Sequence, residues 1–372
     1  MILTVHKYQN SVFVPDRVID NAASVLWCER YQEPGEFAVS MRATPELLRY
    51  FTDHTLMLTR PDSDRAMLPE RMVLKTSSEN GDTLEVTGRS AESIPHSRII
   101  FQDITMNHFA NGAAMLYYLM QENVAGYWFY HSDSNHRESG KYRFIPFFNV
   151  GNVTVLPDET EVKAQPFGEN LGDFTETICK ACDIGFRVRT EKSDRNLYYE
   201  FYRGTDRSKT VIFSKDFQNL GDTEYQFNRR TYFNSVTVAG DGAGKDRARQ
   251  TQTLHSSALA SGFTLREKFI DAHNISHNTV DENGQPITEV MYNILLAKMA
   301  IAELYASKEE ITFDGEILPF GQFRYRQDYF LGDTVSVRND YGIRGTATVT
   351  EVTEYEDAAG VKVVPKFSEW VV

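Results

Sequence analysis

A Cys-x-x-Cys pair, Cys179 and Cys182, offers the first residue types that could do chemistry. A redox pair needs a thiol whose pKa is lowered at a helix N-terminus, and a single pair needs further ligands to hold zinc. Here the pair stands at the far end of an expected helix, where the helix dipole opposes a thiolate. The third cysteine, Cys28, follows Trp27 and is expected to pack in a core as a small hydrophobe. Three cysteines provide no disulfide framework, so we predict neither a redox nor a metal function for them.

Three other stretches have the residue types of a site. Residues 239–246 are similar to a phosphate-binding loop, but Ala239 replaces the first Gly and Asp246 replaces the residue that would meet magnesium. The stretch His131–His136 has metal-ligand types in a polar, turn-like segment, and a metal site also needs support around its ligands. The stretch Asp62–Asp64 has the same character. We interpret all three as solvated turns or loops.

No catalytic residue can be named from the sequence. The paired carboxylates of a glycoside hydrolase come from distant strands, and the 52 acidic residues offer too many candidates. A Gly-x-Ser-x-Gly elbow and a His-Glu-x-x-His helix are both absent from the sequence. The pair Asp206-Arg207 is interpreted as a turn or a subunit contact held by hydrogen bonds from the guanidinium. We therefore expect no cofactor and no metal.

Length and composition indicate a folded protein of several domains. The chain has 372 residues, which suggests two to four domains, and its 19 Tyr and 24 Phe favour sheet over helix bundle. A net charge of −13 argues against ordinary binding of double-stranded DNA, although an acidic channel would let a duplex slide through without sticking. The N-terminus shows no signal-peptide pattern, and no stretch approaches the roughly 20 apolar residues of a membrane span.

The two ends of the chain predict mostly strands. Residues 1–105 contain short strands separated by turns, with one helix that Thr44 would cap and Pro45 would begin. Residues 325–369 predict three antiparallel strands that close a β-barrel or sandwich. Their two-residue alternation of apolar and polar positions slips between Val349 and Val352, which predicts a β-bulge there.

The middle of the chain is mixed. Residues 106–196 predict a small α+β segment, with one helix over Ala113–Met120 and another that Asn170 would cap. The strongest helix is expected over Glu289–Tyr305. Its apolar positions recur at helical spacing: Ile294, Leu295, Lys298, Ile301, Ala302 and Tyr305, with Met291, Leu296 and Leu304 broadening the apolar face.

Several short motifs follow one another in a characteristic order. Near the N-terminus these are Trp27, Gly35-Glu36-Phe37, Gly88-Arg89 and Arg98-Ile99-Ile100. In the middle they are Gly204-x-Asp206-Arg207, Phe213-Ser214, Phe217-x-Asn219-Leu220 and Asn234 before Val236-x-Val238. At the C-terminal end they are Asp328 to Asp333, Tyr341-Gly342, Thr350-Glu351-Val352 and Pro365-Lys366-Phe367. In these motifs and their order the sequence resembles the tail-hub proteins of long-tailed bacteriophages and prophages.

The resemblance implies a fold class and a domain plan. The expected fold is α+β and mainly β, with two tube-type antiparallel β-barrel domains and mixed α+β domains inserted between and within them, as in phage baseplate hubs. The first tube domain would be residues 1–105, and a mixed domain would follow over 106–196. The second tube domain would be split between 197–245 and 308–372, around an inserted helical or irregular domain at 246–307.

The resemblance also implies a function without bond chemistry. The chain would form a homotrimeric ring, the hub at the distal end of the tail, and contact the distal tail protein, the tape-measure protein and tail-tip or fibre proteins. DNA would cross its lumen without specific binding. It would be a virion protein, assembled in the bacterial cytoplasm and not inserted in a membrane. The residues expected to matter most for folding or assembly are Gly204, Asp206, Arg207, Asn219, Gly332 and Asp333.

Two alternatives stay open at this point. One is a tail-tip enzyme that degrades polysaccharide or peptidoglycan, because an acidic, aromatic-rich β chain suits sugar binding. The other is the hub subunit of a contractile injection apparatus, which would share the same fold.

Overall fold

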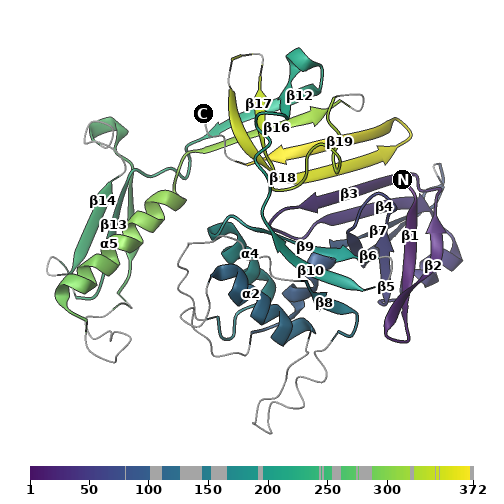
Figure 1. Ribbon diagram of the computed structural model, residues 1–372, viewed down its shortest axis with the longest axis horizontal. Coiled ribbons are helices and arrows are strands. Elements are labelled where there is room, and N and C mark those ends of the chain that lie inside the picture. Colours follow the sequence, from purple (N-terminus) through teal and green to yellow (C-terminus); the bar gives the residue numbers. More distant parts are fainter. Residues whose placement is uncertain are drawn as a thin grey trace, which may run out of the picture. The chain divides into compact units, whose positions relative to one another are not determined.

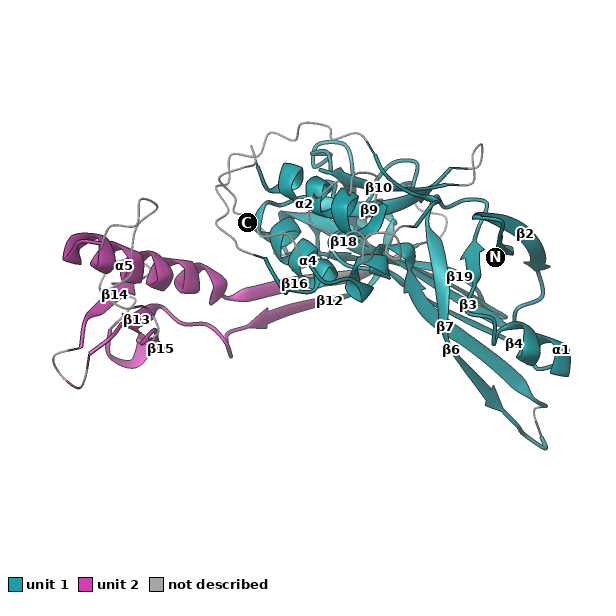
Figure 2. Cartoon of the chain, turned by 90° about the horizontal axis from the view of Figure 1, so that it is seen from below, with its two compact units in different colours: residues 1–224, 313–372 teal, residues 225–312 magenta. Residues whose placement is uncertain are grey.

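A computed structural model describes most of the chain. The described residues are 1–79, 81–100, 111–125, 145–151, 166–191, 196–242, 244, 247–253, 261–273, 275, 287–318, 322–339, 341–342 and 344–368, and for 312–317 the backbone alone is described. The chain divides into two compact units, which are residues 1–224 with 313–372, and residues 225–312 (Figure 2).

The larger unit is built on one extended, mainly antiparallel sheet (Figure 1). Its main path runs in the order β12-β16-β19-β18-β3-β4-β7-β6-β5-β1-β2, and β17 joins β18 to β11 beside this path. The strands from the N-terminal part are β1 (Leu3–Gln9), β2 (Val12–Ile19), β3 (Ser24–Arg30), β4 (Glu36–Arg42), β5 (Leu56–Thr59), β6 (Ala66–Lys75) and β7 (Thr83–Ser90). The others are β11 (Ile212–Ser214), β12 (Leu220–Asn228), β16 (Glu310–Ile317), β17 (Thr334–Arg338), β18 (Arg344–Asp357) and β19 (Gly360–Phe367).

Strand β3 joins the two β-rich ends of the chain. It pairs with β4 on one side, where Trp27 lies opposite Phe37, and with β18 on the other, where Trp27 lies opposite Glu354. Trp27 and Phe37 are both buried in the core under the N-terminal strands. The early Trp and the Gly-x-Phe strand of the sequence motif are therefore cross-strand neighbours that fill one core.

The closing strands agree with the sequence in number and in the place of one irregularity. Strands β17 and β18 pair antiparallel, as do β18 and β19, and the second pairing shifts register between Val349 and Glu351. The β-bulge predicted between Val349 and Val352 is thereby confirmed. Its extra residue redirects the long strand β18 between its pairing with β17 and its pairing with β3.

A mixed layer packs beside this sheet within the larger unit. It contains the small sheet β8-β10-β9, made of β8 (Phe148–Val150), β9 (Gly185–Thr190) and β10 (Leu197–Tyr202). Helices α2 (Gly112–Met120) and α4 (Leu171–Ala181) share its core. The side chain of Asn170 accepts hydrogen bonds from the Gly172 and Asp173 amides, so the predicted N-cap is confirmed. The short helix α1 (Pro45–Tyr50) begins at the predicted Thr44 cap.

The smaller unit has a sheet and a helix of its own. The sheet has the order β14-β13-β15 and consists of β13 (Ser235–Ala239), β14 (Arg249–Thr253) and β15 (Glu267–Asp271). Helix α5 (Glu289–Ala306) packs on it, burying Tyr292, Leu296, Ala300 and Leu304 at four-residue intervals against Val236 and Val238. The predicted helix over Glu289–Tyr305 is confirmed.

The mainly β, α+β fold class expected from the sequence is confirmed. The division into two tube domains and two inserted domains stays a prediction. One assignment within it differs from the structure, because strand 235–239 was placed in the second tube domain. Among the described strands it pairs with β14 and β15 in the smaller unit.

Candidate assembly site

The Cys-x-x-Cys pair lies in a core. Cys179 is in the last turn of α4, Cys182 is its C-cap, and both are buried. Burial raises the pKa of the Cys179 thiol well above its ordinary value, and burial raises that of Cys28 to about 11. Thiols held neutral in this way are poor nucleophiles and poor metal ligands. Within the described ranges no cluster of three His, Cys, Asp or Glu residues could hold a metal ion.

Native thiols are therefore expected to resist alkylation. Treating the folded chain with iodoacetamide at pH 8 should leave Cys28, Cys179 and Cys182 unmodified, because all three are buried. In guanidinium chloride all three should react, as counted by intact mass spectrometry. Rapid labelling of Cys179 in the folded chain would contradict the buried placement.

The structure describes only some of the other stretches that contain ligand-type residues. His131–His136 lies outside the described residues, and so does Asp246. The stretch Asp62–Asp64 is described, and its interpretation as a solvated turn was wrong for Ser63. The Ser63 side chain is buried and donates a 2.6 Å hydrogen bond to Glu29.

Glu29 belongs to a largely buried ionic cluster, which we define as Glu29, Arg60, Arg326 and Glu354, and the Ser63 hydroxyl is hydrogen-bonded to it. Glu29 comes from β3 and Glu354 from β18, and Arg60 follows β5. The Nη2 atom of Arg326 donates to Glu29 Oε1 at 2.7 Å and to Glu354 Oε2 at 2.6 Å. Arg60 Nη1 donates to the same Glu354 oxygen at 2.8 Å. The cluster thus ties the segment that carries Arg326 to both β-rich ends of the chain.

The electrostatics of Glu29 follow from these partners. Burial by itself would raise the pKa of Glu29, but the guanidinium groups of Arg326 and Arg65 and the Ser63 hydroxyl lower it to about 2. Tyr325 and Trp27 also donate hydrogen bonds to this carboxylate, at 2.8 and 2.9 Å. A carboxylate held ionised by so many donors cannot serve as a general acid. The cluster therefore joins neighbouring strands through ion pairs.

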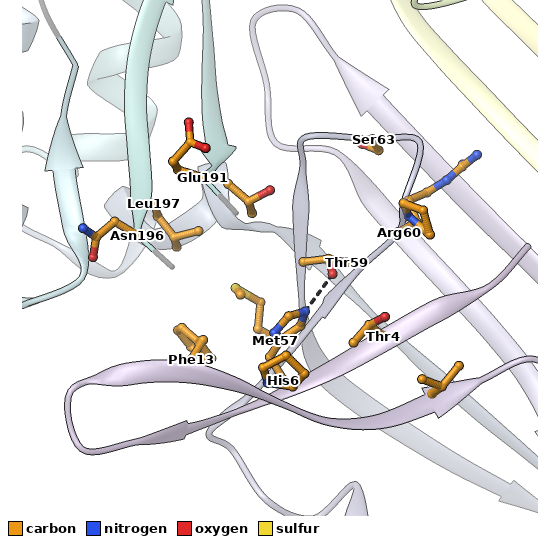
Figure 3. Close-up of a pocket in the computed structure, with 14 residues that line it drawn as sticks. Thr4, His6, Phe13, Met57, Thr59, Arg60, Ser63, Glu191, Asn196 and Leu197 are labelled. Carbon is orange, nitrogen blue, oxygen red and sulfur yellow. Dashed lines mark hydrogen bonds between the residues drawn. The ribbon is translucent and has the colours of Figure 1, made fainter. Parts of the chain in front are cut away.

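Two recesses open near this cluster. One, of about 450 Å³, is lined by Glu29, Arg65 and Arg326 among others. The second, of about 600 Å³, lies between β1, β5 and the β9–β10 edge (Figure 3). His6 and Thr59 form a 2.8 Å hydrogen bond across its floor, and Met57 points into it. Among its described lining residues Glu191 is the single carboxylate.

Five of the six residues predicted to matter come together where residues 204–207 meet residues 332–334. Asp333 is buried and accepts three hydrogen bonds: from the Thr205 amide at 2.7 Å, from Arg207 Nε at 2.6 Å and from the Phe330 amide at 2.9 Å. Gly204 lies against the backbone of Gly332, and a Cβ at 204 would be 1.9 Å from the Gly332 carbonyl. Gly332 itself has φ of +86° and faces the Tyr31 ring. The motif spacing therefore reflects one tight backbone junction.

Two of the six predicted residues, Asp206 and Asn219, hold turns through their side chains. Asp206 accepts a hydrogen bond from the Ser208 amide at 2.9 Å. The neighbouring Arg207 forms an ion pair with Asp333. Asn219 is fully buried away from the junction, where its Oδ1 accepts from the Ser214 amide and its Nδ2 donates to the Ile212 carbonyl. These contacts give each residue a role within one chain. Their role in assembly stays a prediction.

Replacing Asp333 with asparagine should cost about 2–4 kcal/mol of unfolding free energy. The substitution keeps the shape but places an amide donor among three groups that all donate. Urea denaturation followed by circular dichroism would measure it. The matched change Arg207→Gln should cost about 1 kcal/mol or less, because Arg207 is about a third exposed. Equal costs for the two variants would contradict the account of Asp333.

The smaller unit presents an apolar surface, which we call the α5 face. It consists of Met291, Ile294, Leu295, Ile301 and Tyr305, on the side of α5 turned away from its sheet, and each side chain is at least a third exposed. These residues were predicted to form the apolar stripe of the helix. Of the predicted apolar face, the structure packs Leu296 and Leu304 on the sheet, together with Tyr292 and Ala300, which were not predicted. Contiguous exposed apolar surfaces are a common feature of protein–protein interaction sites.

A family model for siphovirus ReqiPepy6 Gp37-like proteins matches residues 16–367. The chain belongs to this Gp37-like family. The match covers both β-rich ends, the mixed segment and the smaller unit. A comparison with curated protein sequences finds no match. Among the described helices of this Gp37-like protein, none is both long enough and apolar enough to cross a bilayer.

Solved structures of tail proteins share the fold of this Gp37-like protein. A 43 kDa tail protein of prophage MuSo2 from Shewanella oneidensis is similar with a TM-score of 0.59 at 12% identity, over 99% of this chain and 98% of that chain. A tail protein from Neisseria meningitidis MC58 has a TM-score of 0.53 at 11% identity, over 99% and 96%. A chain from a PdpA–VgrG complex has a TM-score of 0.51 at 8% identity, over 99% and 64%. The resemblance to phage and prophage tail proteins is thereby confirmed.

Proposed function

We propose that this Gp37-like protein is the hub at the distal end of a siphophage or prophage tail. Three copies would form a ring that joins the tail tube and the distal tail protein to the tail tip. The observation that carries the proposal is the shared fold with a prophage tail protein over 99% of this chain and 98% of the other. A fold retained over the full length of both chains fits a shared structural place in the tail better than a shared single domain would.

The charge of the chain fits a channel through which DNA passes. The net charge of −13 would repel phosphates and keep a duplex from adhering to a lumen. The ring would surround the ejection channel and contact the tape-measure protein and the tail-tip or fibre proteins. Its work would be mechanical, as a closed or opening gate.

The carboxyl groups with resolved pKa shifts favour the ionised form. Every described Asp or Glu with a resolved shift has a lowered pKa, and the buried example, Glu29, is held by arginines. A glycoside hydrolase needs one carboxyl group with a raised pKa to act as the acid. Incubation with purified peptidoglycan and release of soluble fragments would test the enzyme alternative directly.

The native mass of the purified chain tests the ring. Light scattering across a concentration series should give, or approach, about three times the 42.6 kDa mass of one chain. Negative-stain images should then show rings with three-fold symmetry, and the rings should bind to the end of isolated tail tubes. A monomer at every concentration that also fails to bind tubes would overturn the hub proposal.

A contractile injection apparatus is the second candidate for the hub. A chain from a PdpA–VgrG complex also shares the fold, so the fold by itself does not single out a phage tail. The Gp37-like family is defined on a siphovirus protein, which favours the phage tail. Sedimentation of the native particle that contains the chain, followed by imaging for a contractile sheath, would separate the two.

A further inference from the structure

The α5 face has the spacing of a helix-packing seam. Four residues of this face and the neighbouring Lys298 form the seam: Met291, Ile294, Lys298, Ile301 and Tyr305 follow one another at alternating intervals of three and four residues, and all are exposed. When apolar residues recur every 3.5 residues along a helix, they form a stripe that stays in contact with a second helix along its length. Packing on a flat sheet does not require this repeat. A helix with apolar residues on both sides is also normally buried on both. The spacing therefore points to a helix as the occupant.

A basic groove of the smaller unit adjoins the C-terminal end of this seam. Its volume is about 980 Å³, and Tyr305 belongs to both the seam and the groove. Its described lining residues include three cations, Arg229, Arg266 and Lys308, and one carboxylate, Glu309. Arg229 is paired with Glu309 at 2.6 Å, which leaves two positive charges in excess. In a chain with a net charge of −13, this local excess favours an acidic partner.

Aromatic rings hold these cations at the groove. The Arg266 guanidinium lies 6.0 Å from the centre of the Tyr232 ring, and Lys308 Nζ lies 5.1 Å from the centre of the Tyr305 ring. Arg266 is further fixed by its backbone, which exchanges hydrogen bonds with the buried Asn234. Cations held in place lose little freedom when they meet a carboxylate, so the groove is prepared for an anionic group.

The charges argue against a second copy of α5 as the occupant. Two α5 helices packed along the full seam, parallel or antiparallel, would place Lys298 against Lys298. The second α5 would also bring few carboxylates, because Glu303 is already paired with Lys268 at 2.5 Å. A different helix with a carboxylate opposite Lys298 removes this repulsion.

We propose that the α5 face and the basic groove bind an amphipathic helix of another protein. That helix carries apolar residues at 3.5-residue spacing, a carboxylate that meets Lys298 and an acidic first turn that enters the groove. Carboxylates are most favourable in the first turn of a helix, so the partner helix runs antiparallel to α5. The proposal goes beyond the hub assignment, because it requires neither a trimer nor a ring.

A designed peptide of about three heptads provides the probe. It has leucine along the seam, glutamates in its first turn and one glutamate at the position that faces Lys298, and a fluorescein label. The matched control peptide replaces these glutamates with lysines. Fluorescence anisotropy with the full chain should show the acidic peptide binding at least about tenfold more tightly than the basic one.

Variants of the full chain locate the binding. The change Ile294→Asp combined with Ile301→Asp should weaken binding of the acidic peptide at least about tenfold. The change Arg266→Glu combined with Lys308→Glu should abolish the preference for the acidic peptide. Tyr341→Ser, at a 91% exposed aromatic of the larger unit, is the matched control and should bind like the unchanged chain. Circular dichroism should show that each variant keeps its fold.

Three results would overturn the proposal. They are equal affinity for the two peptides, binding that survives Ile294→Asp with Ile301→Asp, and no binding of either peptide at millimolar concentration. Light scattering of the same variants keeps the hub assignment separate. If Ile294→Asp with Ile301→Asp changes the native mass, the α5 face joins copies of this chain, and the partner helix proposed here is wrong.

Discussion

Replacing Arg326 with methionine is expected to destabilise the larger unit by about 3–5 kcal/mol. Arg326 is the cation that Glu29 and Glu354 share, and both carboxylates are buried on neighbouring strands. Methionine has a similar length and leaves both negative charges in place without the one cation that they share. Thermal and urea unfolding followed by circular dichroism would measure the loss.

The pH dependence of this loss has a definite sign. In the unchanged chain the pKa of Glu29 is about 2, below its ordinary value of 4.5, so ionised Glu29 contributes stability above pH 4.5 that is lost as pH falls towards 2. Without Arg326, one of the groups that lower the pKa of Glu29 is lost, whereas the effect of burial, which raises this pKa, remains. The pKa of Glu29 therefore rises, and the variant loses less unfolding free energy when the pH is lowered. The difference in unfolding free energy between the two proteins should therefore shrink as the pH is lowered.

Two further variants test whether the loss of stability in Arg326→Met comes from the unpaired buried carboxylates. Arg89→Met removes a guanidinium from an exposed pair with Glu70 and should cost about 1 kcal/mol or less. Adding Glu354→Gln to Arg326→Met removes one of the unpaired charges and should recover part of the stability. If Arg326→Met costs no more than Arg89→Met, the ionic cluster does not hold the strands together.

Replacing Gly204 with alanine is expected to cost about 3 kcal/mol or more. The added Cβ would lie 1.9 Å from the Gly332 carbonyl, and a backbone group cannot rotate away as a side chain can. Gly332 is itself confined by the Tyr31 ring behind it, so the junction has no direction in which to relax. The melting temperature and the yield of soluble protein would both fall.

Gly81→Ala is the matched control for this change. Gly81 has φ of +74°, but an added Cβ there meets no atom within 4 Å. The substitution should therefore lower the unfolding free energy by only about 1–2 kcal/mol, which is the cost of placing alanine in a left-handed backbone conformation. A melting temperature for Gly204→Ala that equals that of Gly81→Ala would show that the junction can open, and would remove the steric explanation of the 204–207 motif.

Local signals in the sequence predicted local structure well. Asn170 and Thr44 cap helices because their side chains satisfy free amides of the first turn, and this needs only neighbours in the chain. The bulge after Val349 was visible as a slip in alternation for the same reason. The motif residues Gly204 and Asp333 were found through the family resemblance, and composition alone gives no sign that they touch.

Two features, the Glu29–Arg326 ion pair and the packed side of α5, depend on contacts between residues that are far apart in the sequence. Glu29 and Arg326 are 297 positions apart, and among 52 acidic and 39 basic residues nothing marks them as partners. Helix α5 is apolar on both sides, so its periodicity predicts a helix without telling which side meets its own sheet. Packing on one sheet requires apolar residues on only one side of a helix. Apolar residues on two sides of this predicted helix were therefore the sequence signal for the α5 face.

The position of β3 between β4 and β18 has a consequence for synthesis. Residues 25–30 reach their second neighbour only after residues 351–356 have left the ribosome. At typical elongation rates this delay is on the order of tens of seconds. During that time one edge of the nascent N-terminal sheet offers unpaired amides and carbonyls, a template for wrong pairing with other chains. The final sheet forms late, from contacts of high sequence separation that fold slowly, and the yield of the chain should depend on how well the cell shields that edge.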